Sequence, residues 1–193
     1  MPYSRLPKDK WAAKTKRLVA AHPLDSKEVV EVVLLAWDAI FESQIGPHGF
    51  KIGTHLFPKP QIMGFLLHEL IPLEFAARHP SQWRGEEQAG DKDLVYIPDA
   101  RFSVEIKTSS HKPKIFGNRS YAQQPTDAKK NKSGYYLAVN FERFDKRKRE
   151  RPKIVRVRFG WLDHTDWVGQ AAATGQQAHL TPECEGRKLI TLL

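Results

Sequence analysis

Residues 92–110 read KDLVYIPDARFSVEIKTSS. Two apolar runs, 94–97 and 102–106, flank the turn-forming residues 98–101, where the proline suits an early position of a turn. The pattern predicts a β-hairpin. Its strands are apolar on both faces, which is typical of the buried middle of a sheet, so we expect the hairpin at the centre of the fold.

Three charged residues lie at the open end of this hairpin. Glu105 and Lys107 are two residues apart, so their side chains project from the same face of the strand. If the turn is centred near residues 99–100, opposed residues have numbers that sum to roughly 199, which brings Asp93 to the 105–107 region. Hard oxygen ligands suit Mg²⁺, which takes one or two carboxylates plus phosphate oxygens of a substrate. The pattern predicts a magnesium site at Asp93 and Glu105, with Lys107 placed to orient water, stabilise charge at phosphorus or accept a proton.

Two other aspartates near this end of the chain are weaker candidates. Asp99 follows a proline, but it lies in the turn, roughly 20 Å along the strand from Asp93, so we interpret it as a turn residue. Asp91 would replace Asp93 only if the register of the hairpin shifted. A lone Glu-x-Lys pair is usually a solvated pair of side chains, so the prediction rests on the aspartate, the hairpin and the apolar strand together.

Helices are predicted ahead of the hairpin, in residues 9–21, from Asp25 to about residue 41, and in residues 62–79. Asp25 is expected to cap the second helix, with Glu28 three residues later completing a capping box. The third helix is apolar almost all round, and Pro72 in its middle is expected to kink or split it. Residues 45–60 contain many glycines and prolines, which indicates a long loop or a short hairpin.

Strands are predicted behind the hairpin, in residues 134–141, 153–162 and 188–193. Residues 80–92 and 108–133 are polar and show no strong pattern. Helices followed by strands indicate an α/β or α+β domain with a mixed sheet.

The composition narrows the class of partner. The 193 residues include 31 Lys and Arg against 22 Asp and Glu, so the formal net charge is +9. The positive charge clusters in residues 5–17 and 143–158, which favours a phosphate-binding surface and hence nucleic acid; a protein that is basic for solubility alone is the alternative. Hydrophobic residues make up 40%, which excludes disorder of the whole chain.

Several classes of protein are disfavoured. The single cysteine, Cys184, excludes a disulfide framework and a multi-cysteine zinc cluster, and the eight histidines lack the spacing of zinc hydrolases. No phosphate-binding loop of an NTP-driven motor is found. No run of eighteen apolar residues and no signal-peptide segment is found either, so we expect no membrane span and a cytosolic location.

The arrangement of Asp93, Glu105 and Lys107 resembles that of the PD-(D/E)XK nuclease superfamily, whose core is a mixed sheet flanked by helices. Lys92, rather than a proline, precedes the matching aspartate. A closer resemblance, to the ScaI family of type II restriction endonucleases, covers FKIGTHLFPKPQIMGFLLHELIP (50–72) and KDLVYIPDARFSVEIKTSSHKPKIFGNRSYAQ (92–123). It implies a prokaryotic, Mg²⁺-dependent enzyme that cuts both strands of a short palindromic site in double-stranded DNA, usually as a homodimer.

The resemblance also bears on the residues of the third predicted helix. Nucleases of the superfamily often draw a third carboxylate from a helix ahead of the hairpin, which points to Glu69 as a metal ligand; a glutamate on the helix surface is the alternative. Glu74 is a weaker candidate because it follows Pro72. His68 is interpreted as a member of the core or of a polar network.

The segment 108–124 leaves the catalytic strand directly and is well placed to enter a groove of DNA, although an ordinary surface loop is the alternative. It offers residue types suited to phosphates and base edges, and its candidate DNA-binding residues are Lys112, Lys114, Asn118, Arg119, Tyr121 and Gln123. The basic run 141–153 lacks residues that read bases, so it is expected to contact phosphates or to form a solvated hairpin tip.

The sequence thus predicts one nuclease domain over residues 1–193, with a basic segment 1–24, a helical part 25–79, and the catalytic hairpin, sheet and DNA-contact loops in 90–193. The predicted function is that of a type II restriction endonuclease, with a cognate DNA methyltransferase in the same system. A repair or junction-resolving nuclease of the same fold is the first alternative, and a non-catalytic DNA-binding protein is the second.

Overall fold

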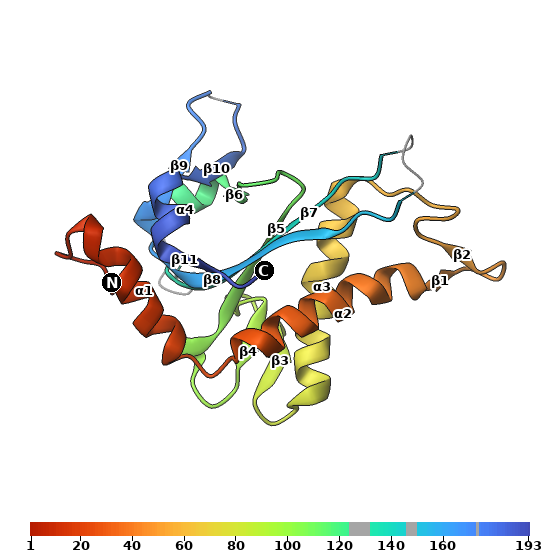
Figure 1. The fold of residues 1–193 in the computed structure, drawn as a ribbon, viewed down its shortest axis with the longest axis horizontal. Helices are drawn as coiled ribbons and strands as arrows, with labels where there is room; N and C mark the ends of the chain where they lie inside the picture. The colour runs from red at the N-terminus through yellow and green to blue at the C-terminus, as the bar shows by residue number, and fades with distance from the viewer. Residues whose placement is uncertain (124–131, 146–149, 173) are drawn as a thin grey trace.

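A six-stranded mixed sheet lies at the centre of the computed structural model, which describes residues 1–123, 132–145, 150–172 and 174–193 (Figure 1). Its strand order is β11-β8-β7-β5-β4-β3. The strands are β3 (Trp83–Gly85), β4 (Leu94–Tyr96), β5 (Val104–Ser109), β7 (Gly134–Phe141), β8 (Ile154–Leu162) and β11 (Leu189–Thr191). β5 and β7 pair in parallel, and the other neighbours pair antiparallel. The predicted mixed sheet flanked by helices is confirmed.

Two long helices cover one face of this sheet. They are α2 (Ser26–Glu42) and α3 (Pro60–Arg78), which lie against each other beside β3, β5 and β8 (Figure 1). The core here combines fully buried residues of both helices with alternate residues of β7, including Val33, Leu67, Phe75, Leu137 and Val139. The chain reaches α2 through η1 (Lys8–Lys10) and α1 (Trp11–Ala20).

The start of α2 differs from the prediction in one detail. Asp25 is the N-cap, as predicted, and its carboxylate accepts hydrogen bonds from the backbone N–H groups of Lys27 and Glu28. The capping box is not formed, because the carboxylate of Glu28 instead contacts His79 at 2.8 Å and Arg78 at 3.5 Å. Glu28 therefore ties the start of α2 to the end of α3.

The predicted break at Pro72 does not split α3, which continues to Arg78. Proline removes one hydrogen bond of the helix ladder, and its ring crowds the preceding turn. Pro72 is buried, and so are its neighbours Ile71 and Phe75 in the core. Tertiary packing therefore holds the helix through the proline.

A second, three-stranded sheet covers part of the other face. It has the order β6-β10-β9, from β6 (Phe116–Asn118), β9 (Trp167–Gly169) and β10 (Gln177–Leu180), and it is antiparallel. The helix α4 (Pro182–Lys188) completes this side. The sequence analysis predicted neither this sheet nor α4. β6 and β9 have three residues each, which is too few for a recognisable alternation. The residues of α4 resemble a turn, because the helix has fewer than two full turns of good helix formers.

The remaining elements are short. The hairpin of β1 (Gln44–Ile45) and β2 (Phe50–Lys51) confirms the predicted short hairpin after α2. Three single turns, η2 (Ala100–Phe102), η3 (Arg119–Ala122) and η4 (His164–Asp166), connect strands. β3 falls in a segment interpreted as a polar connection.

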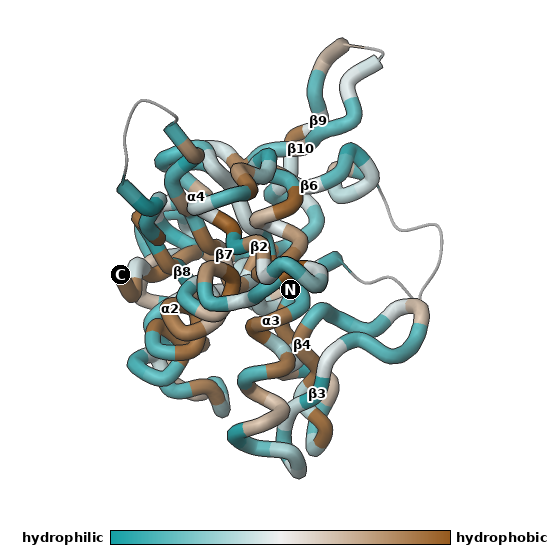
Figure 2. The backbone as a smooth tube through the Cα atoms, turned by 90° about the vertical axis from the view of Figure 1, so that its right-hand side faces the viewer, coloured by the Kyte–Doolittle hydropathy of each residue, from teal (hydrophilic) through white to brown (hydrophobic). Residues whose placement is uncertain are grey.

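Hydropathy follows this layering. In Figure 2 the hydrophobic segments gather at α2, α3 and β7 in the interior, whereas the peripheral connections are mostly hydrophilic. In the part of the chain that the structure describes, no helix has the length and apolar character needed to cross a membrane.

Candidate active site

The central hairpin brings Asp93 to β5 as predicted. β4 and β5 pair at Leu94 and Val104, whose numbers sum to 198. Asp93 directly precedes β4, and its Oδ2 accepts a hydrogen bond of 2.6 Å from the backbone N–H of Ile106. The aspartate is therefore attached to β5 at the residue that separates Glu105 from Lys107.

Glu105 and Lys107 form the closest ion pair of the site. Lys107 Nζ lies 2.6 Å from Glu105 Oε1 and 3.2 Å from the carbonyl oxygen of Ile106. The side chains of both residues are 13% exposed. This pair and Asp93 are the three residues that the sequence analysis placed together.

Two further groups contact Glu105, and the sequence analysis predicted neither contact; it assigned Tyr121 to DNA binding. Lys92 Nζ lies 3.5 Å from Glu105 Oε2, and the Tyr121 hydroxyl donates a hydrogen bond to Glu105 Oε1. Burial lowers the pKa of Lys92, while the attraction of Glu105 opposes that shift. Lys92 was recognised only as the residue that replaces the motif proline. The signal available in the sequence was the position of Lys92 next to Asp93. Because side chains alternate at the end of a strand, this neighbour is expected near Glu105 of the partner strand.

The charges of this cluster keep both carboxyl groups ionised. Burial raises the pKa of Asp93, but the combined effect of His68, Lys107 and the Ile106 amide lowers it by more. The pKa therefore lies below its ordinary value. Burial also raises the pKa of Glu105, and Lys107 and Lys92 more than offset that effect. Both carboxylates are therefore charged at neutral pH, in a largely buried, cation-rich environment.

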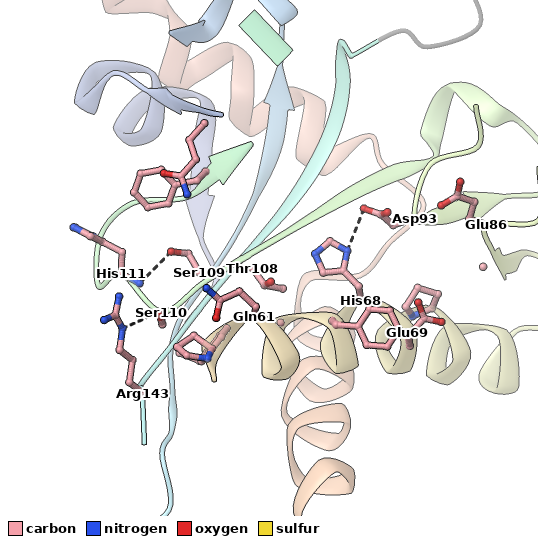
Figure 3. A pocket seen from close by; sticks show the side chains of 18 of the residues that line it. Gln61, His68, Glu69, Glu86, Asp93, Thr108, Ser109, Ser110, His111 and Arg143 are labelled. Atoms are coloured by element: carbon pink, nitrogen blue, oxygen red, sulfur yellow. Dashed lines mark hydrogen bonds and ion pairs between the residues drawn. The ribbon is translucent and has the colours of Figure 1, made fainter. Parts of the chain in front are cut away.

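A cleft of about 940 Å³ opens beside Asp93 (Figure 3). Its walls include His68 and Glu69 of α3, Glu86 after β3, and residues 108–111 at the end of β5. His68 Nδ1 lies 3.7 Å from Asp93 Oδ2, which agrees with its interpretation as a polar-network residue. Glu69 points into the same cleft, and Glu86 is a carboxylate of the cleft that the sequence analysis did not single out.

The two faces of β5 have different surroundings. Thr108 lines the cleft next to α3, whereas Glu105 and Lys107 project from the opposite face because strand residues alternate. On that face Lys107 Nζ lies 4.9 Å from the ring centroid of Tyr121. Asp93, which contacts both His68 and β5, is the residue that links the cleft to the Glu105–Lys107 pair.

The two weaker aspartates have structural roles. Asp99 caps η2 by accepting from the N–H of Arg101, which confirms it as a turn residue. Asp91 is held by Arg84 at 2.7 Å and accepts from the backbone N–H groups of Glu87 and Gln88. Neither carboxylate is directed to the hairpin's open end.

The predicted DNA-binding residues occupy the connection after β5 and the turn η3. Lys112, Asn118 and Gln123 are exposed, and Lys114, Arg119 and Tyr121 are partly buried. Arg119 donates to the carbonyl oxygens of Ala172 and Gly175, which fixes it against the loop before β10. Tyr121 is held between Glu105 and the ring of Trp167, 5.3 Å away, so its hydroxyl is engaged within the protein.

The basic run 141–153 is only partly described, because residues 146–149 lie outside the described residues. Arg143 donates to the hydroxyl of Ser110 at 3.0 Å, and Arg151 is paired with Asp38. These two arginines therefore also serve contacts within the protein.

A metal ion would have to rely on few protein ligands here. Within residues 1–123, 132–145, 150–172 and 174–193, no three or more histidine, cysteine or acidic side chains are grouped so that they could hold a metal ion. Asp93 and Glu105 supply two ionised carboxylates, which suffices for Mg²⁺, an ion that keeps several waters and binds one or two carboxylates together with substrate phosphate. The type of donor, two ionised carboxylates, therefore suits this ion.

Comparisons with known proteins identify the family of the chain. The model of the ScaI restriction endonuclease family matches residues 1–193. The type II restriction enzyme ScaI of Streptomyces caespitosus is 48% identical over 192 residues, which cover 99% of this chain and 84% of that relative.

Proposed function

The chain belongs to the ScaI restriction endonuclease family, and from this premise we propose that Asp93, Glu105 and Lys107 form its active site. A type II restriction endonuclease is a site-specific hydrolase whose substrate is DNA, so family membership selects the first of the three functions predicted from the sequence. The observation that carries the residue assignment is the 2.6 Å hydrogen bond from the Ile106 amide to Asp93, which joins the aspartate to the strand of Glu105 and Lys107.

Enzymes of this type generally use a divalent metal ion, and we propose Mg²⁺ for this chain, held by Asp93 and Glu105. Lowered pKa values keep both carboxylates charged, which supports the assignment. Glu69, on the wall of the cleft that Asp93 also lines, is the proposed third ligand. When bound, the ion supplies an acidified water and neutralises charge on the scissile phosphate.

The protein's own groups provide orientation and charge. The Ile106 amide fixes the Asp93 carboxylate, and the Ile106 carbonyl together with Glu105 fixes the ammonium group of Lys107. A fixed cation beside the carboxylates can orient the attacking water and stabilise the negative charge that develops at phosphorus. Lys107 is therefore proposed to act on the transition state, where the added charge appears.

Double-strand cleavage requires two such sites. Each chain carries one hairpin with this constellation, so we propose a homodimer whose two-fold axis matches a short palindromic sequence. A cognate DNA methyltransferase is expected in the same system, because the host's copies of that sequence need protection.

The decisive experiment incubates the protein with Mg²⁺ and a plasmid of mixed sequence and then sequences the ends of the products. Discrete fragments with one shared end sequence are expected. Glu105→Gln and Lys107→Ala are expected to reduce the cleavage rate by about 10³-fold or more, because each removes a charge that acts in the transition state. The matched control is Asp99→Asn, which removes the carboxylate at the turn end of the same hairpin and should cut like the wild type.

Two results would overturn the assignment. Cleavage by Lys107→Ala at the wild-type rate would exclude the proposed lysine. A loss of cleavage rate of the same size in Asp99→Asn would show that the catalytic aspartate is the one in the turn.

A further inference from the structure

A buried polar network lies under the segment that follows β5. It consists of Asn140 of β7, Arg158 of β8 and Glu185 of α4, which are 0%, 3% and 8% exposed. The three side chains come from three different elements and converge beneath residues 111–115. Burying such groups is costly unless they are hydrogen-bonded, so their partners show what the network stabilises.

The partners are backbone groups of that one segment. Asn140 Nδ2 donates to the carbonyl oxygens of His111 at 2.7 Å and Lys114 at 3.0 Å. Arg158 Nη2 donates to the carbonyl oxygen of Pro113 at 2.9 Å and to Asn140 Oδ1 at 3.0 Å.

The third member completes the attachment from α4. Glu185 Oε1 accepts from the backbone N–H of Ile115 at 3.0 Å, and its other oxygen lies 3.8 Å from Arg158 Nη1. The charges of Arg158 and Glu185 therefore balance each other while both hold the segment. Ile115 itself is fully buried and anchors the end of the segment in the second core.

This attachment decides which parts of the segment face outward. Residues 111–115 form neither helix nor strand, yet three of their carbonyl groups and one amide are turned into the protein. The side chains of His111 and Lys112 are exposed, and His111 lines the cleft next to Ser110 (Figure 3). The segment is thus an irregular loop whose backbone is fixed and whose polar side chains stand at the edge of the cleft.

We propose that Asn140, Arg158 and Glu185 are positioning residues that set the sequence specificity of cleavage by fixing the backbone of residues 111–115 against DNA. The inference rests on the proposed function together with the expectation from the sequence that the segment after β5 contacts DNA. Hydrogen bonds to base edges discriminate between bases only when donors and acceptors are held in place. The network provides that constraint from the interior of the protein, and its partners among the described residues do not include the catalytic carboxylates.

The test compares cleavage of the recognition sequence with cleavage of sequences that differ by one base pair. Asn140→Asp keeps the shape of the side chain and the oxygen that accepts from Arg158. It replaces the donating NH₂ group by a carboxylate oxygen, which cannot donate, so the hydrogen bonds to the His111 and Lys114 carbonyl groups are lost. The ratio of the two single-turnover rates is expected to fall at least tenfold, with the rate at the recognition sequence changed less than about threefold. Glu185→Ala, which frees the Ile115 amide from another element, should lower the same ratio.

The matched control is Val139→Ala. Val139 is fully buried in the same strand and faces the core on the other side of the sheet. The Val139→Ala substitution should reduce stability while leaving the ratio of the two single-turnover rates at the wild-type value. A folded Asn140→Asp or Glu185→Ala protein with unchanged specificity would overturn the inference.

One measurement needs no variant. In the wild-type protein, hydrogen exchange at the Ile115 amide should be as slow as in β7, with or without DNA. Exchange as fast as in exposed loops would overturn the inference even if the variants fail to fold. The wild-type plasmid digest tests the enzymatic function by itself, so its failure is distinct from a failure of this inference.

Discussion

At the scale of single residues, Glu105 is the most heavily contacted group of the proposed active site. Two ammonium groups and one phenol surround its carboxylate, from Lys107, Lys92 and Tyr121. Burial and the nearby Glu105 carboxylate raise the pKa of Tyr121 far above its usual value, so the phenol stays a donor. The carboxylate is thereby held in one position by groups of the protein itself.

Removing the phenol hydroxyl tests this arrangement. In Tyr121→Phe the ring that packs on Trp167 is kept, and the hydrogen bond to Glu105 is lost. A hydrogen bond to a charged group contributes about 1.5–3 kcal/mol, so the single-turnover cleavage rate should fall by about 10- to 100-fold. DNA affinity, measured without divalent metal, should stay at the wild-type value.

The comparison variant is Gln123→Ala, which removes an exposed side chain near the same turn. It should weaken DNA binding and leave the single-turnover rate unchanged. If Tyr121→Phe instead lost affinity at an unchanged rate, the residue would act by contacting DNA, as the sequence analysis predicted, and not by holding Glu105.

His22 provides a second prediction for a single residue. Its ring is buried among four aromatic rings, Nε2 lies 2.9 Å from the carbonyl oxygen of Phe102, and Nδ1 accepts from the Leu24 amide. The neutral ring satisfies both contacts, with Nε2 as the donor. A second proton on Nδ1 would face an N–H group, and burial lowers the pKa of His22 to about 4.

The free energy of unfolding should therefore depend on pH through His22. The unfolded chain takes up the proton near pH 6.5, whereas the folded protein resists it down to about pH 4. Stability falls as the pH drops through this window, by about 3 kcal/mol from this group. The difference in the free energy of unfolding between the wild type and His22→Asn, measured by urea unfolding at pH 7, 5.5 and 4, should shrink by that amount as the pH falls. Parallel curves would contradict the prediction.

At the scale of secondary-structure elements, the site depends on how closely α3 approaches β5. Gly64 of α3 faces Thr108, and a Cβ at Gly64 would lie 2.6 Å from Thr108 Oγ1 but 3.7 Å from Thr108 Cβ. The first distance is a clash and the second an ordinary contact. The glycine therefore permits the close packing that puts His68 beside Asp93.

Gly64→Ala should destabilise the protein by about 1–2 kcal/mol, since overpacking outweighs the roughly 1 kcal/mol gained in helix propensity. Thr108→Ala removes the clashing oxygen, so the double variant Gly64→Ala, Thr108→Ala should recover most of the loss. The measurement is a double-mutant cycle of urea unfolding with Thr108→Ala alone as the reference. Additive effects would show that the two elements do not meet at this point.

The same scale shows what a sequence can and cannot predict. The central hairpin is identified by two apolar runs around a turn, and the long strands β7 and β8 and the long helices α2 and α3 have enough residues for their hydrophobic pattern to identify them. The short strands β6 and β9 and the helix α4 pack against one another through long-range contacts, and no local pattern marks them. The continuity of α3 through Pro72 likewise depends on tertiary packing.

The residues of the proposed active site divide in the same way. Asp93, Glu105 and Lys107 were placed together because strand alternation and hairpin register are local rules. Tyr121 and Glu86 reach the site or its cleft from other elements, and the Asn140–Arg158–Glu185 network joins three elements. Such convergence follows only from the completed fold.

At the scale of the whole molecule, the net charge of +9 is an incomplete guide to the DNA-binding surface. Lys8 pairs with Glu183, Arg158 with Glu185, and Lys188 with Asp166 at 2.7 Å. These cations belong to internal contacts of the fold. The affinity for DNA is therefore expected to come from exposed groups beside the cleft, such as Lys112, more than from the total charge.

The proposed homodimer yields the last prediction, since a symmetric pair of sites should cut both strands in one encounter. Wild-type protein should convert supercoiled plasmid directly to the linear form. Protein refolded from a mixture with a ninefold excess of Lys107→Ala forms mostly mixed dimers among its active species, each with one working site. Those dimers should cut one strand only, so nicked circles should accumulate.

Mixing the two proteins after folding, just before the assay, is the control and should give linear product at a reduced rate. If the co-refolded mixture also gave only linear product, each chain would complete both cuts by itself, and the requirement for a second copy would be wrong.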